Sequence, residues 1–146
     1  MGAPPPDLDA LVAWFETLTP NSVARTAEFY AADAQFKDPF NEVRGAEAIR
    51  RIYAHMFTQV VEPRFRVLER VQDAGGALLV WEFGFHGRPG AAPSVVRGAS
   101  HLKFAADGRI AVHRDYWDTG EELYAHVPLL GALLRLLRRR LAAPQA

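Results

Sequence analysis

Several residue types and patterns are absent from this chain of 146 residues, and each absence excludes a class of function. The chain has no cysteine, which excludes disulfides, thiolate metal sites and cysteine nucleophiles. Its 17 basic residues balance 17 acidic ones, whereas nucleic-acid binding favours a basic excess, so no nucleic-acid partner is expected. No apolar run approaches the ~20 residues that span a bilayer, and residues 1–6 do not form a signal segment. We therefore expect a cytoplasmic location.

The motifs of metal and nucleotide sites are missing as well. No glycine-rich loop follows an expected strand and opens a helix, as phosphate-binding loops do. The histidines His55, His86 and His101 show no metal-ligand spacing, and no carboxylate-rich calcium loop is present. Neither Ser94 nor Ser100 lies in a nucleophile elbow. We therefore expect neither a metal nor a cofactor.

What remains is the composition of one domain with a substantial core, since 49% of the residues are apolar. We expect a disordered proline-rich lead over residues 1–6, a main domain over residues 7–120 and a helical tail over residues 121–146. Helical spacing of apolar residues predicts helices over residues 8–18, 20–30 and 49–60. Alternating or apolar runs bounded by turn signals predict strands over residues 34–38, 64–71, 77–86, 95–104 and 109–118.

The order of these elements predicts the fold class. Three helices and a short strand precede four strands joined by hairpins, with Asp107-Gly108 as a strong hairpin signal. This segregation is typical of an α+β domain in which helices cover one face of a curved antiparallel sheet. Within the strand over residues 64–71, Phe65, Val67 and Val71 are expected on one face.

The carboxylate of Asp38 lies between Phe36 and Phe40, and Pro39 biases it toward an extended backbone at the end of a strand. A carboxylate among aromatic rings is poorly solvated and is therefore a candidate proton carrier. Asp-Pro is also a common start of a tight turn, and local sequence alone favours the turn. The surroundings of Asp38 decide between these two interpretations.

The tail combines leucines with arginines. After Pro128 come seven leucines, Leu129, Leu130, Leu133, Leu134, Leu136, Leu137 and Leu141, with Arg135, Arg138, Arg139 and Arg140 crowded toward the end. Cations are favoured at a helix C-terminus. The favoured interpretation is therefore a capped amphipathic helix that packs on its own domain or on a twin subunit. The alternative is a helix that contacts a membrane surface.

Two segments resemble a known superfamily. The first reads FYAADAQFKDPF over residues 29–40 and is followed by Arg44-Gly45, and the second reads DGRI over residues 107–110 and leads into HRDYWD over residues 113–118. With the order of elements over residues 8–118, they resemble the nuclear transport factor 2-like superfamily. That superfamily includes ketosteroid isomerase, the SnoaL-type polyketide cyclases, scytalone dehydratase and limonene epoxide hydrolase. The resemblance implies a cone whose sheet wraps a deep apolar pocket closed by three N-terminal helices, and a homodimer through the outer sheet face.

The resemblance also implies roles for three residues. Asp38 matches the catalytic base of ketosteroid isomerase. Trp14 and Ser100 stand where that isomerase carries its oxyanion-hole tyrosine and its protonated aspartate. An indole N–H and a hydroxyl still donate hydrogen bonds, but they are weaker acids. We therefore do not expect steroid isomerase activity itself.

The last strand offers further candidates. Two-residue periodicity places His113, Asp115 and Trp117 on one face, and the resemblance directs that face into the pocket. His113 and Asp115 would be ~6.6 Å apart along the strand, too far to assume a direct hydrogen bond, with room for a substrate or water between them. Alternatively, the two residues form a satisfied polar pair, or they lie on the outer face beside Arg114.

Three functions remain, and the first is favoured. The first is a cofactor-independent isomerase, cyclase, lyase or hydrolase that acts by acid–base chemistry on a small apolar carbonyl or epoxide compound, with Asp38, His113 and Asp115 catalytic. Its ligand-binding residues would be Trp14, Phe40, Phe57, Phe83, Ser100 and Trp117. The second is a binding module without chemistry, which a neutralising pair between Asp115 and either Arg114 or His113 would indicate. The third is a protein-interaction domain with a filled pocket and a large apolar outer sheet face.

Overall fold

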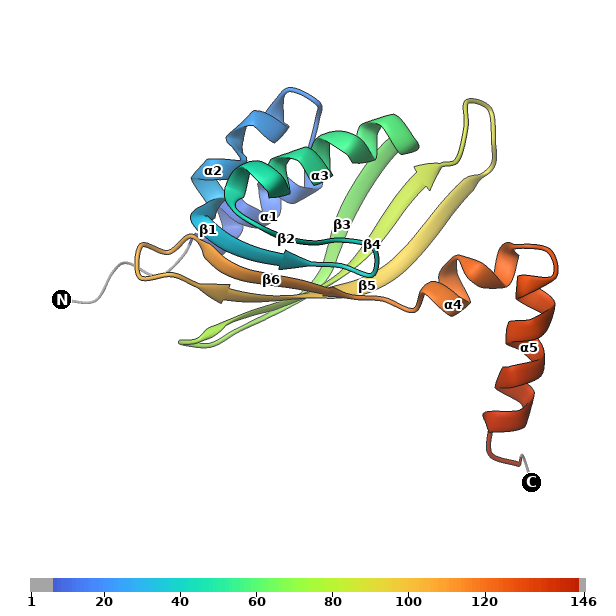
Figure 1. Ribbon diagram of the computed structural model, residues 1–146. Helices are drawn as coiled ribbons and strands as arrows, with labels where there is room; N and C mark the ends of the chain where they lie inside the picture. Colours follow the sequence, from blue (N-terminus) through green and yellow to red (C-terminus); the bar gives the residue numbers. More distant parts are fainter. Residues whose placement is uncertain (1–6, 145–146) are drawn as a thin grey trace.

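The helices precede most of the sheet in the chain and cover one of its faces (Figure 1). The computed structural model describes residues 7–144, so the expected lead over residues 1–6 lies outside the described residues. Asp7 caps helix α1 (Leu8–Glu16), because its side chain accepts a hydrogen bond from the Ala10 N–H at 2.9 Å. A short 3-10 helix, η1 (Ser22–Arg25), leads into α2 (Thr26–Phe29), and the longer helix α3 spans Ala46–Gln59.

Six strands form one sheet in the order β2-β1-β6-β5-β4-β3. Their bounds are β1 (Tyr30–Lys37), β2 (Glu42–Arg44), β3 (Val61–Gln72), β4 (Gly76–His86), β5 (Pro93–Phe104) and β6 (Ile110–Tyr116). The strands β3 to β6 are consecutive antiparallel neighbours, as the hairpin signals predict, whereas β1 pairs with β6 in parallel. The expected α+β class is confirmed.

Three local predictions are wrong. Strand β1 begins at Tyr30 rather than at residue 34, because Tyr30 is already extended and pairs with Ile110 of β6. The sequence did not predict β2, because an edge strand of 3 residues is too short to show a periodicity. Val71 is 64% exposed rather than inward, because the register shifts between Val67 and Glu69 and an extra residue reverses the alternation.

The hydrophobic core lies between the helices and the inner face of the sheet. Its largest fully buried side chains include those of Tyr30, Ile49, Leu79, Leu102 and Ile110. One bulky core side chain on the sheet, that of Trp81, fits only because its cross-strand neighbour is Gly98. Gly98 of β5 pairs with Trp81 of β4, and a Cβ at that glycine would come within 2.5 Å of the indole. Glycine at this position therefore lets the Trp81 ring lie across the neighbouring strand.

The tail leaves the domain after β6. It consists of α4 (Thr119–Glu122), the 3-10 helix η2 (Tyr124–His126) and α5 (Leu130–Leu141). Helix α5 points away from the sheet (Figure 1). Of the two expected partners of this helix, its own domain is therefore wrong, because α4 and η2 carry the chain outward before α5 begins. Packing on a twin subunit stays a prediction. Within residues 7–144, no helix is long and apolar enough to cross a membrane.

Candidate functional site

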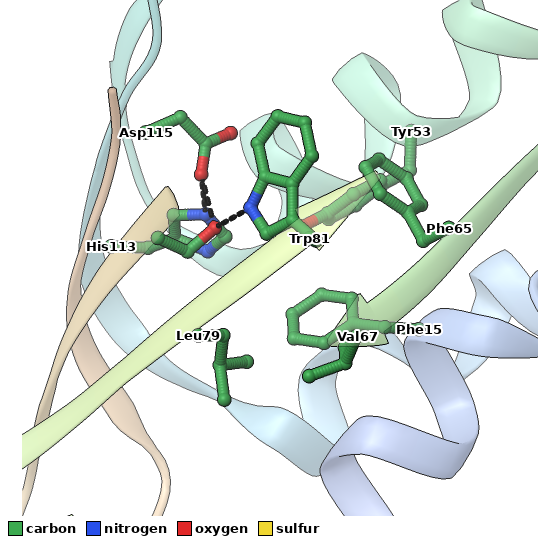
Figure 2. Close-up of a pocket in the computed structure, with 9 residues that line it drawn as sticks. Phe15, Tyr53, Phe65, Val67, Leu79, Trp81, His113 and Asp115 are labelled. Carbon is green, nitrogen blue, oxygen red and sulfur yellow. Dashed lines mark hydrogen bonds and ion pairs between the residues drawn. The ribbon is translucent and has the colours of Figure 1, made fainter. Parts of the chain in front are cut away.

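A narrow cavity lies under the helices on the inner face of the sheet. It leaves about 30 Å³ of space for water-sized molecules, enough for roughly two waters. Its walls are mainly aromatic and aliphatic, and one end is polar (Figure 2). The lining residues are Phe15, Tyr53, Phe65, Val67, Leu79, Trp81, Ser100, His113 and Asp115. The resemblance implies a deep pocket, and the observed space is smaller because these rings occupy most of it.

The polar end is organised around one oxygen of Asp115. Its Oδ1 accepts a hydrogen bond from the Ser100 hydroxyl at 2.5 Å and lies 2.6 Å from His113 Nε2. A carboxylate can only accept, so Nε2 carries the proton in this arrangement. The pairing is possible because Ser100 of β5 lies opposite Asp115 of β6 in the sheet register. His113 is 3% exposed, so these contacts are largely shielded from water.

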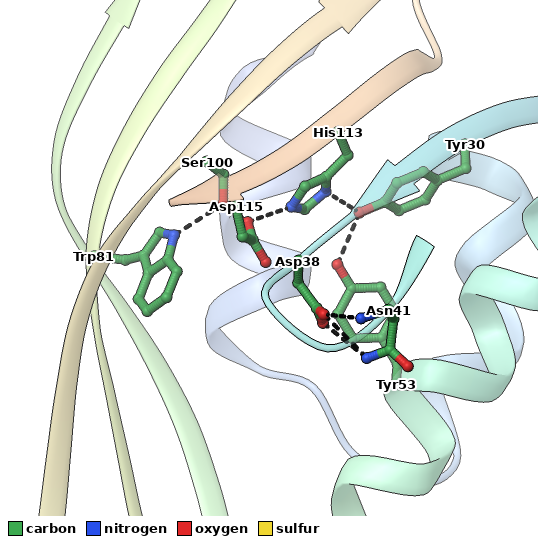
Figure 3. A network of polar contacts seen from close by, with 8 residues as sticks. All are labelled: Tyr30, Asp38, Asn41, Tyr53, Trp81, Ser100, His113 and Asp115. Carbon is green, nitrogen blue, oxygen red and sulfur yellow. Dashed lines mark hydrogen bonds and ion pairs between the residues drawn. The ribbon is translucent and has the colours of Figure 1, made fainter. Parts of the chain in front are cut away.

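Two tyrosines extend this arrangement on the other side of the imidazole (Figure 3). The Tyr30 hydroxyl lies 2.7 Å from His113 Nδ1, and the Tyr53 hydroxyl lies 2.8 Å from that of Tyr30. In a neutral imidazole with Nε2–H, Nδ1 accepts, so Tyr30 donates to it and Tyr53 donates to Tyr30. Burial raises the pKa of both tyrosines well above the usual value, and the negative charge of Asp115 adds to the effect. Both hydroxyls therefore stay protonated near neutral pH.

A second chain of donors reaches the same carboxylate oxygen. The Trp81 indole N–H donates to the Ser100 hydroxyl at 2.8 Å, and Ser100 in turn donates to Asp115 Oδ1. Two chains of hydrogen bonds therefore end at Oδ1: one runs from the tyrosines through His113, and the other runs from Trp81 through Ser100. Among residues 7–144, none donates a hydrogen bond to the second oxygen, Oδ2. The Asp115 side chain is 16% exposed, and it borders both the cavity and an outer groove.

Of the residues that the sequence singles out, three meet at the cavity: Ser100, His113 and Asp115. The shared inward face of His113 and Asp115 follows the predicted periodicity, since Arg114 between them is exposed. Of the alternatives that the sequence left open for these two residues, the structure shows the direct polar pair rather than a gap for a substrate or water. The backbone spacing is that of a strand, but the two side chains turn toward each other and close the gap to 2.6 Å.

The structure places Asp38 at the rim rather than in the cavity. Its Oδ1 accepts hydrogen bonds from the backbone N–H groups of Phe40 and Asn41 at 2.8 and 2.6 Å, and the Asn41 side-chain amide contacts both carboxylate oxygens. These are the contacts of a turn, as local sequence favours. Asp38 borders the outer groove, together with Trp117 and Asp115.

The remaining aromatic candidates do not line the cavity. The Trp14 indole N–H is bonded to the Ser22 carbonyl at 3.0 Å, so it is not available as an orienting donor. Phe40 is 57% exposed and packs edge-on against Trp117. Phe83 stacks between Phe65 and Phe85, and Phe57 packs against the core.

Tyr30 and Tyr53 lie within the helices predicted over residues 20–30 and 49–60, and Trp81 lies within the strand predicted over residues 77–86. These patterns did not indicate the hydrogen bonds of the three side chains. A signal was available, since a buried tyrosine or tryptophan needs a partner for its polar atom, whereas phenylalanine does not. Partners on other strands could not be identified without the register. Among the described residues, no three His, Asp or Glu side chains gather in a way that could hold a metal ion.

Solved structures share this fold at low sequence identity. A protein with a ketosteroid isomerase-like fold from Catenulispora acidiphila, solved in complex with trimethylamine, has a TM-score of 0.68 and 19% identity, over 82% of this chain and 92% of that chain. A protein from Shewanella putrefaciens, provisionally named a SnoaL-like polyketide cyclase, has a TM-score of 0.64 and 19% identity, over 80% and 94%. These similarities define the class of the fold as nuclear transport factor 2-like, or ketosteroid isomerase-like.

The family follows from the sequence itself. The profile of the SnoaL-like domain matches residues 11–113, which is more than half of the chain. The chain therefore belongs to the SnoaL-like domain family, in agreement with the resemblance carried by its two motifs. None of the curated proteins compared with this chain matches it.

The hydrogen bonds from Tyr53 to Tyr30 and from Tyr30 to His113, which we call the tyrosine relay, predict the effect of one substitution. Tyr30→Phe removes the hydroxyl that bridges Tyr53 and His113 and leaves two buried polar atoms without a partner. We expect the free energy of unfolding in urea to fall by roughly 1–3 kcal/mol. The control is Tyr124→Phe, whose side chain is 36% exposed and should change stability by less than about 0.5 kcal/mol. An equal loss in both variants would contradict the relay.

Proposed function

We propose that this protein is a cofactor-independent enzyme of the isomerase, cyclase or lyase kind, in which Asp115 exchanges the proton. The pair between Asp115 and His113 is the contact that the sequence analysis connects with a binding module, but it engages only one carboxylate oxygen. The single observation that carries this proposal is this asymmetry of the Asp115 carboxylate. Oδ1 is held by Ser100 and His113, while Oδ2 accepts no hydrogen bond from residues 7–144. A proton taken from a substrate would therefore go to Oδ2, because Oδ1 already accepts from two donors.

The position of Asp115 suits a proton transfer within one bound substrate. Ser100 and His113 hold Oδ1 by hydrogen bonds, and the aromatic walls leave little room for water beside the carboxylate. A carboxylate held in this way can take a proton from one atom of a bound substrate and return it to another. His113 holds the carboxylate in place by donating to it, and Tyr30 and Tyr53 in turn fix the position of the His113 ring.

The substrate class follows from the shape and chemistry of the cavity. Aromatic and aliphatic walls exclude strongly hydrated molecules, and the polar groups at one end can orient a carbonyl or epoxide oxygen. Since the cavity holds only about two waters, a substrate must displace ring side chains to enter. The outer groove beside Asp115 and Trp117 offers a second approach to the carboxylate.

Comparing two aspartates tests this proposal. Purified wild-type protein, Asp115→Asn and Asp38→Asn are incubated with libraries of small enones and epoxides, and product formation is measured. We expect Asp115→Asn to lower turnover by about 10²- to 10⁴-fold, because an amide cannot take the proton, and Asp38→Asn to lower it much less. The reverse order would make Asp38 the base. Equal turnover by all three proteins would exclude acid–base catalysis by either carboxylate.

A second candidate function is the binding of a small alkylammonium ion without chemistry. The observation that favours it is a carboxylate, already paired with His113, beside the rings of Phe15, Tyr53, Phe65 and Trp81. Aromatic faces and a nearby negative charge attract alkylated ammonium groups. The neighbouring structure from Catenulispora acidiphila contains trimethylamine.

Two ligands of similar shape, one charged and one neutral, distinguish binding that depends on ligand charge from binding that depends on ligand size. Trimethylammonium and the neutral tert-butanol are titrated into the protein while tryptophan fluorescence is recorded. If the site selects a cation, trimethylammonium should bind about 2- to 30-fold more tightly, and Asp115→Asn should reduce this preference. Equal binding of the two ligands, or no binding of either, would contradict the alkylammonium function.

We also propose a homodimer through the outer face of the sheet. Exposed apolar side chains on this face include Val71 and its cross-strand partner Leu78, together with Val95 and Tyr116. A network in which Glu82 pairs with Arg66 and Arg97 crosses the same face, so it is not uniformly apolar as a dedicated protein-interaction domain would require.

Sedimentation tests the homodimer directly. The wild type should have about twice the chain mass of 16.2 kDa at micromolar concentration. Leu78→Arg should shift it toward the single-chain mass, because a C2 axis places this residue in the same interface on both copies. A single-chain mass for the wild type would exclude this dimer.

A further inference from the structure

The last helix is attached to the protein by one side only. Gly131 of α5 is buried against η2, where a Cβ would come within 2.3 Å of the Ala125 carbonyl oxygen. Arg135 extends over the same carbonyl at 3.5 Å. The face of α5 that contains Gly131 and Arg135 is therefore the face that packs on the tail. Most of the remaining helix surface is exposed in the described structure, and Leu134 is half-buried.

The free surface contains an apolar stripe, which we define as Leu130, Leu133, Leu134, Leu137 and Leu141. Their spacing of three and four residues places all five on one side of the helix. Leu133 is 52% exposed, Leu137 is 45% exposed and Leu141 is 85% exposed. These side chains stabilise no contact with the domain, so their burial requires a partner.

The charges of the helix surround this stripe. At ~100° per residue, Arg138 and Arg140 flank it on either side, while Arg135 and Arg139 lie on the opposite face. Residues 123–146 hold four arginines and no acidic residue, whereas residues 1–122 hold 13 basic and 17 acidic residues. The net charge of zero therefore conceals a basic segment that follows the two glutamates of α4.

We propose that α5 binds the surface of an anionic lipid bilayer, with the leucine stripe inserted among the acyl chains and the arginines at the headgroups. A leucine stripe flanked by arginines is the pattern of helices that lie in the interface. The 12 residues of α5 extend only about 18 Å, less than the ~30 Å of the hydrocarbon core, so the helix lies along the surface. Because α5 points away from the sheet, the domain stays away from the lipid charge (Figure 1).

The same charges argue against a second copy of α5 as the occupant of the stripe. Two such helices would bring eight arginines together without an acidic residue between them, and like charges oppose this contact. Seven of the 17 acidic residues already pair with a lysine or an arginine of the domain. Asp9, Glu28, Glu47, Glu82 and Asp107, for example, each pair with an arginine of the domain.

Two neighbouring leucines provide a matched pair for the test. Leu137 lies on the stripe and is 45% exposed, whereas Leu136 lies off the stripe and is 47% exposed. The full chain, Leu137→Gln and Leu136→Gln are mixed with vesicles of phosphatidylcholine and phosphatidylserine, or of phosphatidylcholine alone, and the bound fraction is sedimented. Circular dichroism checks that both variants keep the fold.

We expect binding to the anionic vesicles only, and weaker binding at high salt. Leu137→Gln should weaken the partition about tenfold, and Leu136→Gln by less than about twofold. Equal binding to both vesicle types, no binding, or equal effects of the two substitutions would overturn the proposal. If Leu137→Gln instead lowers the sedimentation mass of the protein without lipid, a second copy is the occupant and the bilayer is not.

Discussion

The structure depends on the two hydrogen bonds that Asp115 Oδ1 accepts under a roof of aromatic rings. Without a charged acceptor at this point, the Nε2–H of His113 and the O–H hydrogen of Ser100 would be buried without an acceptor, which costs free energy. When Asp115 accepts these two hydrogen bonds, Tyr30 can donate to His113, Tyr53 can donate to Tyr30, and Trp81 can donate to Ser100. No buried side-chain nitrogen or oxygen in the described part of the chain lacks a hydrogen-bond partner. The carboxylate of Asp115, which is partly accessible to solvent, thus offsets the free-energy cost of burying these polar side chains.

This arrangement also joins elements that are far apart in the sequence. Tyr30 begins β1, Tyr53 comes from α3, and His113 and Asp115 come from β6. The relay therefore fastens a covering helix to the sheet by directional bonds, in addition to non-directional apolar packing. Directional bonds hold the rings of Tyr53 and Trp81 at the cavity, so its polar end and the ordered carboxylate have the same physical origin.

Local periodicity correctly predicted the features that depend on residues near one another in the sequence. It failed for features that depend on residues far apart in the sequence or on side-chain rotamers. The stripe of α3, the four hairpin-linked strands and the common face of His113 and Asp115 follow from spacing alone. The extended conformation of Tyr30 depends on pairing with Ile110, and the bond between His113 and Asp115 depends on side-chain rotamers. Asp38 shows the converse, since its turn contacts are local and the local sequence favoured them.

The tail obeys a different constraint from the domain. The buried core runs from Leu8 to Ile110, and the side chains packed against it end at Trp117, so no residue of α5 is needed to complete it. A segment freed from core packing would gain solubility from polar residues, yet α5 carries a leucine stripe and four arginines. Exposing this stripe to water is unfavourable and serves no contact within the described chain. Its composition therefore fits the proposed lipid surface outside the domain, whereas the hydrogen bonds of Asp115 form entirely within the domain.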